Sequence, residues 1–259
     1  MIRITFLLRR KPGMDRDEFY RYWREEHGPL VASHAGHINA LRYVQVHTIP
    51  DDATNAALPG ARGRMEPPYD GVAEVWFESR EALVDATSSA AGRAASAALV
   101  EDEARFIDLP NSPLWLAVEH PQVNPTPEVL VARDRSTLVK FYYPLRCHSG
   151  QDMEEAQRYW CSNHGPIIRR QAFGSGIQRY VQVHRVVDEI EDALRSARGT
   201  VTEPYMGHAE LWFDRAALQV STPERKASGQ RAVDDESRFI DFARSSMWLA
   251  KEHVFVDHF

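Results

Sequence analysis

Two histidines, His27 and His164, have the residue type and the sequence setting of a general acid–base group. Each stands four residues after a tryptophan and directly before a Gly-Pro pair, on the apolar face of an expected helix. Imidazole suits proton transfer because its pKa lies close to the working pH. The alternative is a structural role, in which the histidine bonds free carbonyls at the helix end and gains from the negative end of the helix dipole.

Two tyrosines, Tyr43 and Tyr180, each begin a run Tyr-Val-Gln-Val-His that predicts a strand. Each tyrosine shares a strand face with the glutamine and the histidine of its own run, and the valines take the opposite face. The histidines of the two runs are His47 and His184. Burying such a row of polar side chains is costly unless they are hydrogen-bonded. The face therefore borders a wet pocket or forms a satisfied polar ladder where two sheets meet.

Two glutamates, Glu74 and Glu210, stand in the middle of a later expected strand, each beside a tryptophan on the same face. A carboxylate next to an indole in a confined site has its pKa raised, as a general acid or base requires. The alternative, which we favour, is an ion pair with Arg42 or Arg179 across neighbouring strands.

These candidate residues come in pairs because the chain repeats itself. Shifted by 137 positions, residues 21–47 overlay residues 158–184 with 13 of 27 positions identical. Missing such a repeat would mis-assign the fold. The sequence predicts a first repeat over 1–120, a proline-containing linker over 121–136 and a second repeat over 137–259.

Each repeat predicts the element order βαββαβ, which is that of a ferredoxin-like domain. The first helix should begin at the capping residue Asp15 (Asp152 in the second repeat) and stop at Gly28-Pro29. A long helix is expected over 80–107, and a shorter counterpart over 215–240. Because helices cover only one face of each sheet, the two bare faces should pack together. The predicted fold class is α+β, with two fused ferredoxin-like βαββαβ domains sharing one barrel-like core.

The segment Tyr-Trp-x-x-x-His-Gly-Pro, with the later Asp-Glu-x-Arg-Phe-Ile-Asp, resembles the EthD-like family of the dimeric α/β-barrel superfamily. The resemblance covers both repeats. It implies an intramolecular dimeric α/β barrel with a pocket between sheet and helices in each half, usually worked by His and Tyr without a cofactor. Superfamily relatives include polyketide cyclases, muconolactone-type isomerases, decarboxylases, cofactor-free monooxygenases and haem-degrading enzymes, and fold likeness alone does not choose among them.

At three matching positions the second repeat has side chains with polar, titratable groups where the first repeat has none. These are Tyr142, Tyr143 and His208, in place of Thr5, Phe6 and Val72. His208 also shares a strand face with Glu210 and Trp212. Polar groups at core-like positions carry a desolvation cost that only a partner or a function offsets. We therefore expect the second repeat to hold the working site, with the first repeat as the rival.

Composition and motifs exclude several classes of protein. The 31 basic and 37 acidic residues give a net charge of −6, which argues against nucleic-acid and polybasic membrane binders. His34-x-x-His37 is too small a set for a metal site, and we expect no metal and no cofactor. With two cysteines, no membrane-length apolar run and an N-terminus unlike a secretory signal, a cytoplasmic protein is expected.

The function predicted from sequence is that of a cofactor-independent lyase or isomerase. It would carry out decarboxylation, cyclisation or lactone or double-bond rearrangement on a small aromatic or polyketide-like compound, without nucleic-acid or membrane partners and with a homodimer as a possible assembly. His164 or His208 would move the proton, and Tyr143 and Tyr180 would stabilise the oxyanion. Trp212 and Arg146 would hold the ring and an acidic group.

The alternatives are a haem-handling or cofactor-free monooxygenase and a non-catalytic small-molecule-binding protein. The candidate catalytic residues are His164, His208, Tyr143, Tyr180, Glu210, His27 and Tyr43, and the candidate substrate-binding residues are Arg146, Trp212 and His184.

Overall fold

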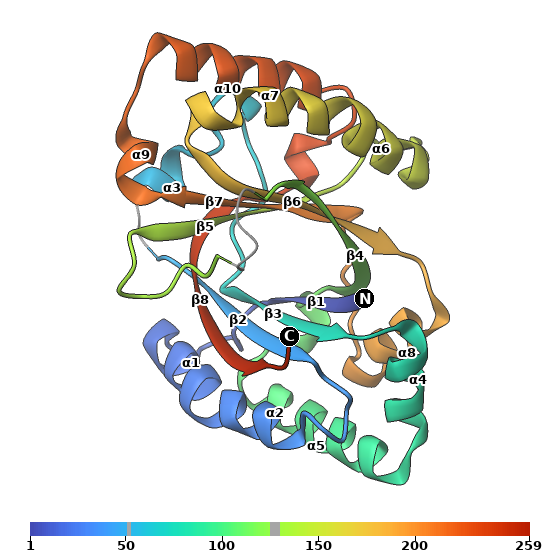
Figure 1. Ribbon diagram of the computed structural model, residues 1–259. Coiled ribbons are helices and arrows are strands. Elements are labelled where there is room, and N and C mark those ends of the chain that lie inside the picture. The colour runs from blue at the N-terminus through green and yellow to red at the C-terminus, as the bar shows by residue number, and fades with distance from the viewer. Residues whose placement is uncertain (51–52, 125–129) are drawn as a thin grey trace.

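The computed structural model describes residues 1–50, 53–124 and 130–259. Their eight strands close into one antiparallel barrel in the order β1-β3-β2-β8-β5-β7-β6-β4 (Figure 1). The strands are β1 (Ile2–Leu8), β2 (Arg42–Thr48), β3 (Gly71–Phe77), β4 (Leu114–Val123), β5 (Leu138–Leu145), β6 (Ile177–Val186), β7 (Gly207–Asp214) and β8 (Trp248–Asp257). The expected α+β class is confirmed.

Each repeat supplies four neighbouring strands of the barrel. The first repeat gives the order β4-β1-β3-β2, and the second gives the matching order β8-β5-β7-β6. The barrel closes through two pairings between the repeats, β2 with β8 and β4 with β6. Closure leaves no open sheet edge, so neither repeat presents an unpaired strand to solvent in the described structure.

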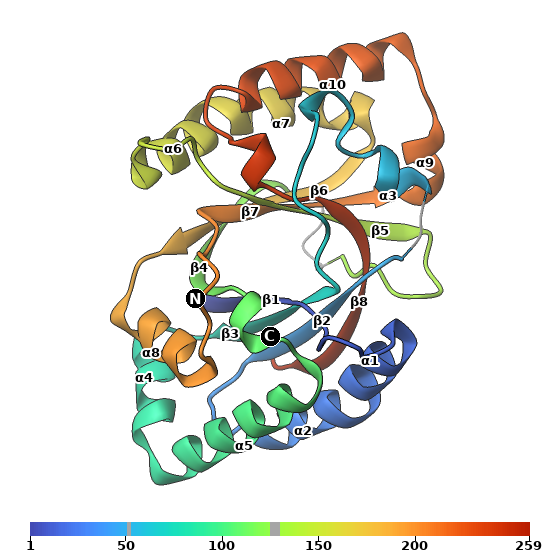
Figure 2. The same cartoon turned by 180° about the vertical axis from the view of Figure 1, so that it is seen from behind.

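Helices cover the outside of the barrel in two layers on opposite sides (Figures 1 and 2). One layer contains α1 (Arg16–Tyr22), α2 (Gly28–His34), α4 (Arg80–Ser88), α5 (Ala90–Phe106) and α8 (Glu189–Arg198). The other contains α3 (Ala53–Ala57), α6 (Met153–Tyr159), α7 (Gly165–Ser175), α9 (Arg215–Gln219) and α10 (Pro223–Glu236). Two helices thus lie in the layer of the repeat to which they do not belong. Helix α8 of the second repeat lies with the first-repeat helices, and α3 of the first repeat lies with the second-repeat helices. Within the described residues, no helix combines the length and apolar character needed to cross a membrane.

The expectation that Gly28-Pro29 stops the first helix is wrong. The chain continues from α1 through a π-helical turn at Trp23–His27 directly into α2, and the second repeat does the same at Trp160–His164. Proline lacks an N–H group and its ring crowds the carbonyl four residues earlier, so an α-helix cannot pass through it unchanged. The wider π turn, closed by the Gly28 N–H on the Trp23 carbonyl, accommodates the proline. The helix start was predicted correctly, because Asp15 accepts hydrogen bonds from the backbone of the first turn.

The long helix expected over 80–107 is two helices, α4 and α5, which meet at Ser89. Ser89 has extended backbone angles, and its hydroxyl caps α5 by accepting from the Gly92 N–H. The counterpart over 215–240 is likewise divided into α9 and α10. The linker expected over 121–136 begins inside β4, which runs on to Val123, while residues 125–129 lie outside the described part of the chain.

Candidate functional site

Each half of the molecule has a cavity between the outer face of its sheet and its helices. The first-repeat cavity has a volume of about 770 Å³ and is lined by Phe6, Leu8, Val75 and Phe77 of the sheet and by helical residues that include His27. The second-repeat cavity measures about 410 Å³. Both volumes lie in the range of small-molecule sites, and both walls are mainly apolar. Tyr43 borders the first cavity, and Tyr143, Tyr180 and His164 border the second.

In each cavity the histidine is held by a buried aspartate from the last turns of the opposite helix. His27 Nδ1 lies 2.8 Å from Asp102 Oδ2, and His164 Nδ1 lies 2.8 Å from Asp235 Oδ2. The far oxygen of Asp102 accepts a hydrogen bond from the Tyr22 hydroxyl at 2.6 Å. An ionised carboxylate can only accept, so Nδ1 carries the proton. Nε2 is then the ring nitrogen left to the cavity.

The aspartates are ionised because their neighbours favour the charged form. The hydrogen bond from His27 is the main reason that the pKa of Asp102 is lowered. Burial would raise the pKa of Asp235, but the hydrogen bonds from His164 and Tyr159 outweigh it and lower that pKa. A fixed carboxylate of this kind orients an imidazole and stabilises the imidazolium that forms when it takes a proton. The structural alternative for these histidines, bonding to helix-end carbonyls, is not what the structure shows.

The two tyrosines have hydroxyl groups that accept two hydrogen bonds each. Tyr43 Oη accepts from Trp23 Nε1 at 3.2 Å and from Gln45 Nε2 at 3.1 Å. Tyr180 Oη accepts from Trp160 Nε1 and Gln182 Nε2, both at 3.0 Å. Among the described residues, neither hydroxyl proton has an acceptor. Each tyrosine can therefore donate to an oxygen of a bound molecule.

The polar row on these strands is a satisfied ladder, but its partner is the helix layer and not the other sheet. Gln45 Nε2 donates to the Trp23 carbonyl at 2.6 Å, and His47 Nε2 bonds Gln45 Oε1 at 2.9 Å. His47 also stacks on the Trp23 ring, with 4.5 Å between the ring centroids. Because burial lowers the pKa of His47, its imidazole stays neutral and serves as a donor in the ladder. The π turn supplies the carbonyl that anchors this ladder, so it positions the tyrosine.

His184, a candidate binding residue, plays the same part in the second repeat. It stacks on Trp160 and bonds Gln182 Oε1 at 3.2 Å, and burial lowers its pKa to about 3. Arg146 lies elsewhere, on the ring of Tyr205 and paired with Glu66, and borders neither of the two cavities. Tyr143 does border the second cavity, but its hydroxyl lies 3.4 Å from Glu236.

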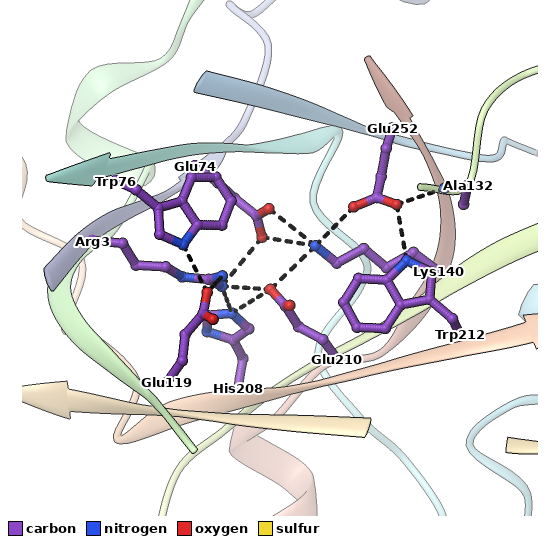
Figure 3. A network of polar contacts seen from close by, with 10 residues as sticks. All are labelled: Arg3, Glu74, Trp76, Glu119, Ala132, Lys140, His208, Glu210, Trp212 and Glu252. Atoms are coloured by element: carbon purple, nitrogen blue, oxygen red, sulfur yellow. Dashed lines mark hydrogen bonds and ion pairs between the residues drawn. The ribbon is translucent and has the colours of Figure 1, made fainter. Parts of the chain in front are cut away.

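Three further candidates, His208, Glu210 and Trp212, point into the barrel and away from the cavities (Figure 3). They meet a buried charge network in which the Arg3 guanidinium contacts His208, Glu210 and Glu74. The structure does not bring His208 together with His164. Burial lowers the pKa of His208 to about 3, so this imidazole is neutral.

The network has two equivalent halves joined at the centre (Figure 3). Arg3 of the first repeat pairs with Glu119, and Lys140 at the matching position of the second repeat pairs with Glu252 at 3.3 Å. The tryptophans bond the same two carboxylates, Trp76 to Glu119 and Trp212 to Glu252. The expected pairing of Glu74 with Arg42 or Arg179 is wrong, because the first-strand cations point inward and reach it. Arg42 and Arg179 instead lie over the tryptophan rings.

Glu74, His208 and Glu210 form the one described group of three side chains whose ligand atoms lie within 4.8 Å of one another. A carboxylate–imidazole cluster of this kind could hold a divalent cation. Here the Arg3 guanidinium contacts all three side chains, and Lys140 Nζ lies 3.0 Å from Glu74 and 3.2 Å from Glu210. Two protein cations thus take the place that a metal would need.

Stability should depend on pH through Glu74. Burial and the neighbouring Glu210 raise the pKa of Glu74 to about 8. The folded chain then holds a proton that the unfolded chain releases near pH 4.5, so the free energy of unfolding should fall as pH rises from about 5 to 8. One proton gives a slope of at most about 1.4 kcal/mol per pH unit. Urea unfolding across this range should show the slope in the wild type, and Glu74→Gln should reduce it; an unchanged slope in the variant would assign it to other groups.

Sequence reasoning missed the aspartates Asp102 and Asp235 and the glutamates that follow them. Glu103 forms a two-point ion pair with Arg198 at 2.7 and 2.8 Å, and Glu236 forms one with Arg62 at 2.6 and 2.8 Å. The signal was in the repeated Asp-Glu-x-Arg-Phe-Ile-Asp segment. In both halves its first residue holds the cavity histidine, and its second residue lines the cavity. Each arginine comes from the other repeat, which no comparison within one repeat could reveal.

An antiparallel barrel with two helical layers and a cavity in each half defines a protein of the dimeric α/β-barrel class. The model of the EthD domain matches residues 11–110 and again residues 148–243. The chain therefore belongs to the EthD family, with two copies of the domain. No curated protein matches the chain.

Two solved structures align with nearly the whole chain. A "putative monooxygenase" from Fusobacterium nucleatum is 10% identical, with a TM-score of 0.52 over 98% of this chain and 93% of that one. A "putative monooxygenase" from Lactobacillus acidophilus is 9% identical, with a TM-score of 0.46 over 99% and 95% of the two chains. At such identities the likeness to the first structure concerns the fold alone.

Proposed function

We propose that this protein is a cofactor-independent lyase or isomerase that transfers a proton on a small aromatic or polyketide-like compound. One observation carries the proposal: in both repeats an imidazole held by an aspartate and a tyrosine hydroxyl with an uncommitted proton border the same apolar cavity. These are the general base and the oxyanion donor that such chemistry needs. The residues assigned are His27, Asp102 and Tyr43 in one cavity, and His164, Asp235 and Tyr180 in the other.

The reaction step follows from the roles of these groups. His27 Nε2 accepts a proton from a carbon next to a carbonyl, and the electron pair of that C–H bond moves onto the carbonyl oxygen. Tyr43 donates a hydrogen bond to this oxygen, while Asp102 stabilises the imidazolium. Return of the proton to a different carbon completes an isomerisation. In a decarboxylation His27 Nε2 first takes the proton of the substrate's carboxylic acid. The C–C bond to the carboxylate then breaks, its electron pair moves onto the carbonyl oxygen, and the imidazolium returns the same proton to carbon after CO₂ leaves.

We further propose that each repeat is one ferredoxin-like domain, over 1–120 and 137–259, joined by a linker over 121–136. The order of elements and the matching strand order of the two halves support this division. The sheet, the histidine and the tyrosine of each cavity then come from one domain, and the cavity lies on the helix side of that sheet.

Proton transfer can be tested before the physiological substrate is known. A panel of phenols, aromatic β-keto acids and lactones is incubated with the protein in D₂O, and deuterium uptake and CO₂ release are measured by NMR and mass spectrometry. We expect exchange with at least one compound class and its loss in the Asp102→Asn, Asp235→Asn double variant. Binding without exchange or turnover would instead indicate the non-catalytic binding protein, and oxygen consumption the cofactor-free monooxygenase.

Activity should not require a cofactor, because the proposed base and the oxyanion donor are both side chains of the protein. Purified protein is expected to be colourless, and dialysis against EDTA should leave turnover unchanged. The checks are an absorption spectrum, with and without added haem, and a rate measurement before and after chelation. A Soret band with haem-dependent turnover, or loss of rate restored by one particular metal, would contradict the prediction.

A further inference from the structure

Each cavity is completed by a segment that belongs to the other repeat. The connection between the second and third strands of the second repeat crosses over and places α8 against the first-repeat layer (Figure 1). The same connection of the first repeat, which carries α3, crosses in the opposite direction. The ion pairs Arg198–Glu103 and Arg62–Glu236 fix these crossings, since each joins one repeat to the other.

The two crossing segments differ in what they bring to the cavity. Helix α8 lines the first-repeat cavity with Ile190, Leu194 and Ala197, spaced by four and three residues so that they share one face. The segment that carries α3 gives the second-repeat cavity Leu58 as its apolar contribution, beside Arg62. The first cavity, at about 770 Å³, is nearly twice as large as the second, at about 410 Å³.

Helix α8 is anchored at both of its ends. At its start, Asp188 pairs with Arg80 of the first repeat. After its last residue, Thr200 Oγ1 donates to the Leu109 carbonyl at 3.1 Å. In its first turn, Glu191 is 1% exposed and accepts from the Leu116 N–H on β4. The helix therefore acts as a wall of the first cavity, with a shape that is fixed before any ligand arrives.

We propose that α8 and the α3 segment give the two sites different ligand selectivity. The first-repeat site takes a polycyclic phenol or ketone with three or four fused rings, against the apolar wall of α8. The second-repeat site takes a compound with one or two rings. In both, the ligand oxygen meets the tyrosine hydroxyl. This inference rests on the proposed function for the chemical class of the ligand, but its test measures binding without turnover.

The test uses two fluorescent phenols with different numbers of rings, 1-hydroxypyrene with four and 2-naphthol with two. Binding to the full chain is titrated by fluorescence, with the number of sites taken from calorimetry. We expect one site per chain for 1-hydroxypyrene. Leu194→Glu should weaken it at least tenfold because it places a charge on the apolar wall. Leu58→Glu, the matched control, should leave 1-hydroxypyrene binding unchanged and weaken 2-naphthol at the second-repeat site.

Unfolding curves for both variants separate lost binding from lost structure. If Leu194→Glu does not fold, Ala197→Trp fills the same cavity without a charge and should again weaken 1-hydroxypyrene only. Two equivalent sites for 1-hydroxypyrene, or equal effects of the Leu194 and Leu58 substitutions, would overturn the inference. Selective binding in a protein that shows no proton exchange would uphold the inference and remove the proposed function.

Discussion

Removal of both cavity histidines, His27→Ala with His164→Ala, is expected to lower turnover by roughly 10²–10⁴-fold, the usual contribution of a general acid–base group. The expected loss follows from the geometry, because each imidazole has Nδ1 fixed by an aspartate and Nε2 left to a cavity. The measurement is kcat and KM at equal concentrations of folded protein. Since both rings are only 4% exposed, melting curves must accompany the kinetics.

The single variants decide which half works on a given substrate. If the second repeat holds the chemistry, as its extra polar residues suggested, His164→Ala should be inactive and His27→Ala near the wild-type rate. His208→Ala is the matched control, because His208 lies in the barrel and contacts Arg3. It should lower stability and leave kcat of the folded protein unchanged. Full activity in the His27→Ala, His164→Ala double variant would contradict the catalytic role of both histidine–aspartate pairs.

Substitution of Asp102 gives a further test of the His27–Asp102 pair. Asp102→Asn keeps the size of the side chain but can donate to Nδ1, which would place the imidazole proton on Nε2 and block proton abstraction. We therefore expect Asp102→Asn to lower kcat with little change in KM for substrates of the first cavity. Tyr22→Phe removes only the second bond to the same carboxylate and should have a smaller effect.

The repeat explains why the fold and part of the site could be predicted from the sequence. Identical residues in both copies indicated the helix, the strands and the two pairs His27/His164 and Tyr43/Tyr180, and all four side chains border a cavity. Alternation also placed His208 correctly with Glu210 and Trp212 on one strand face. It could not show which face meets the helices, because both faces of a barrel sheet covered by helices are buried.

The remaining errors have a common physical cause. Hydrogen-bond and ion-pair partners such as Asp102 for His27, or Arg3 for Glu210, lie far apart in the sequence and meet only when the barrel closes. The capping and helix-stop patterns of the sequence predicted the start of the first helix correctly, but they did not predict that the helix continues through Gly28-Pro29. There the π turn is stabilised by Gln45, a residue on a different element.

Substitution of Lys140 by methionine should destabilise the fold by about 3–5 kcal/mol, the cost of leaving buried charges without their partner. Lys140 is 1% exposed, and its Nζ lies 3.0 Å from Glu74, 3.2 Å from Glu210 and 3.3 Å from Glu252. Methionine fills similar volume, so the loss would report charge and not a cavity. Urea unfolding at pH 8 is the measurement, with cavity binding as a check that the native state is retained.

The loss of unfolding free energy in Lys140→Met should depend on how many of the buried carboxylates around Lys140 remain. Lys140→Met combined with Glu74→Gln removes the ammonium group together with the carboxyl group that ionises near pH 8. The double variant should recover part of the stability at that pH, because Arg3 can still pair with Glu210. In the single variant the carboxylates can also relieve their repulsion by taking up protons, so its deficit should shrink as pH falls toward 5. A loss of stability under about 1 kcal/mol at pH 8, or one that does not change with pH, would contradict the prediction that the buried carboxylates depend on Lys140.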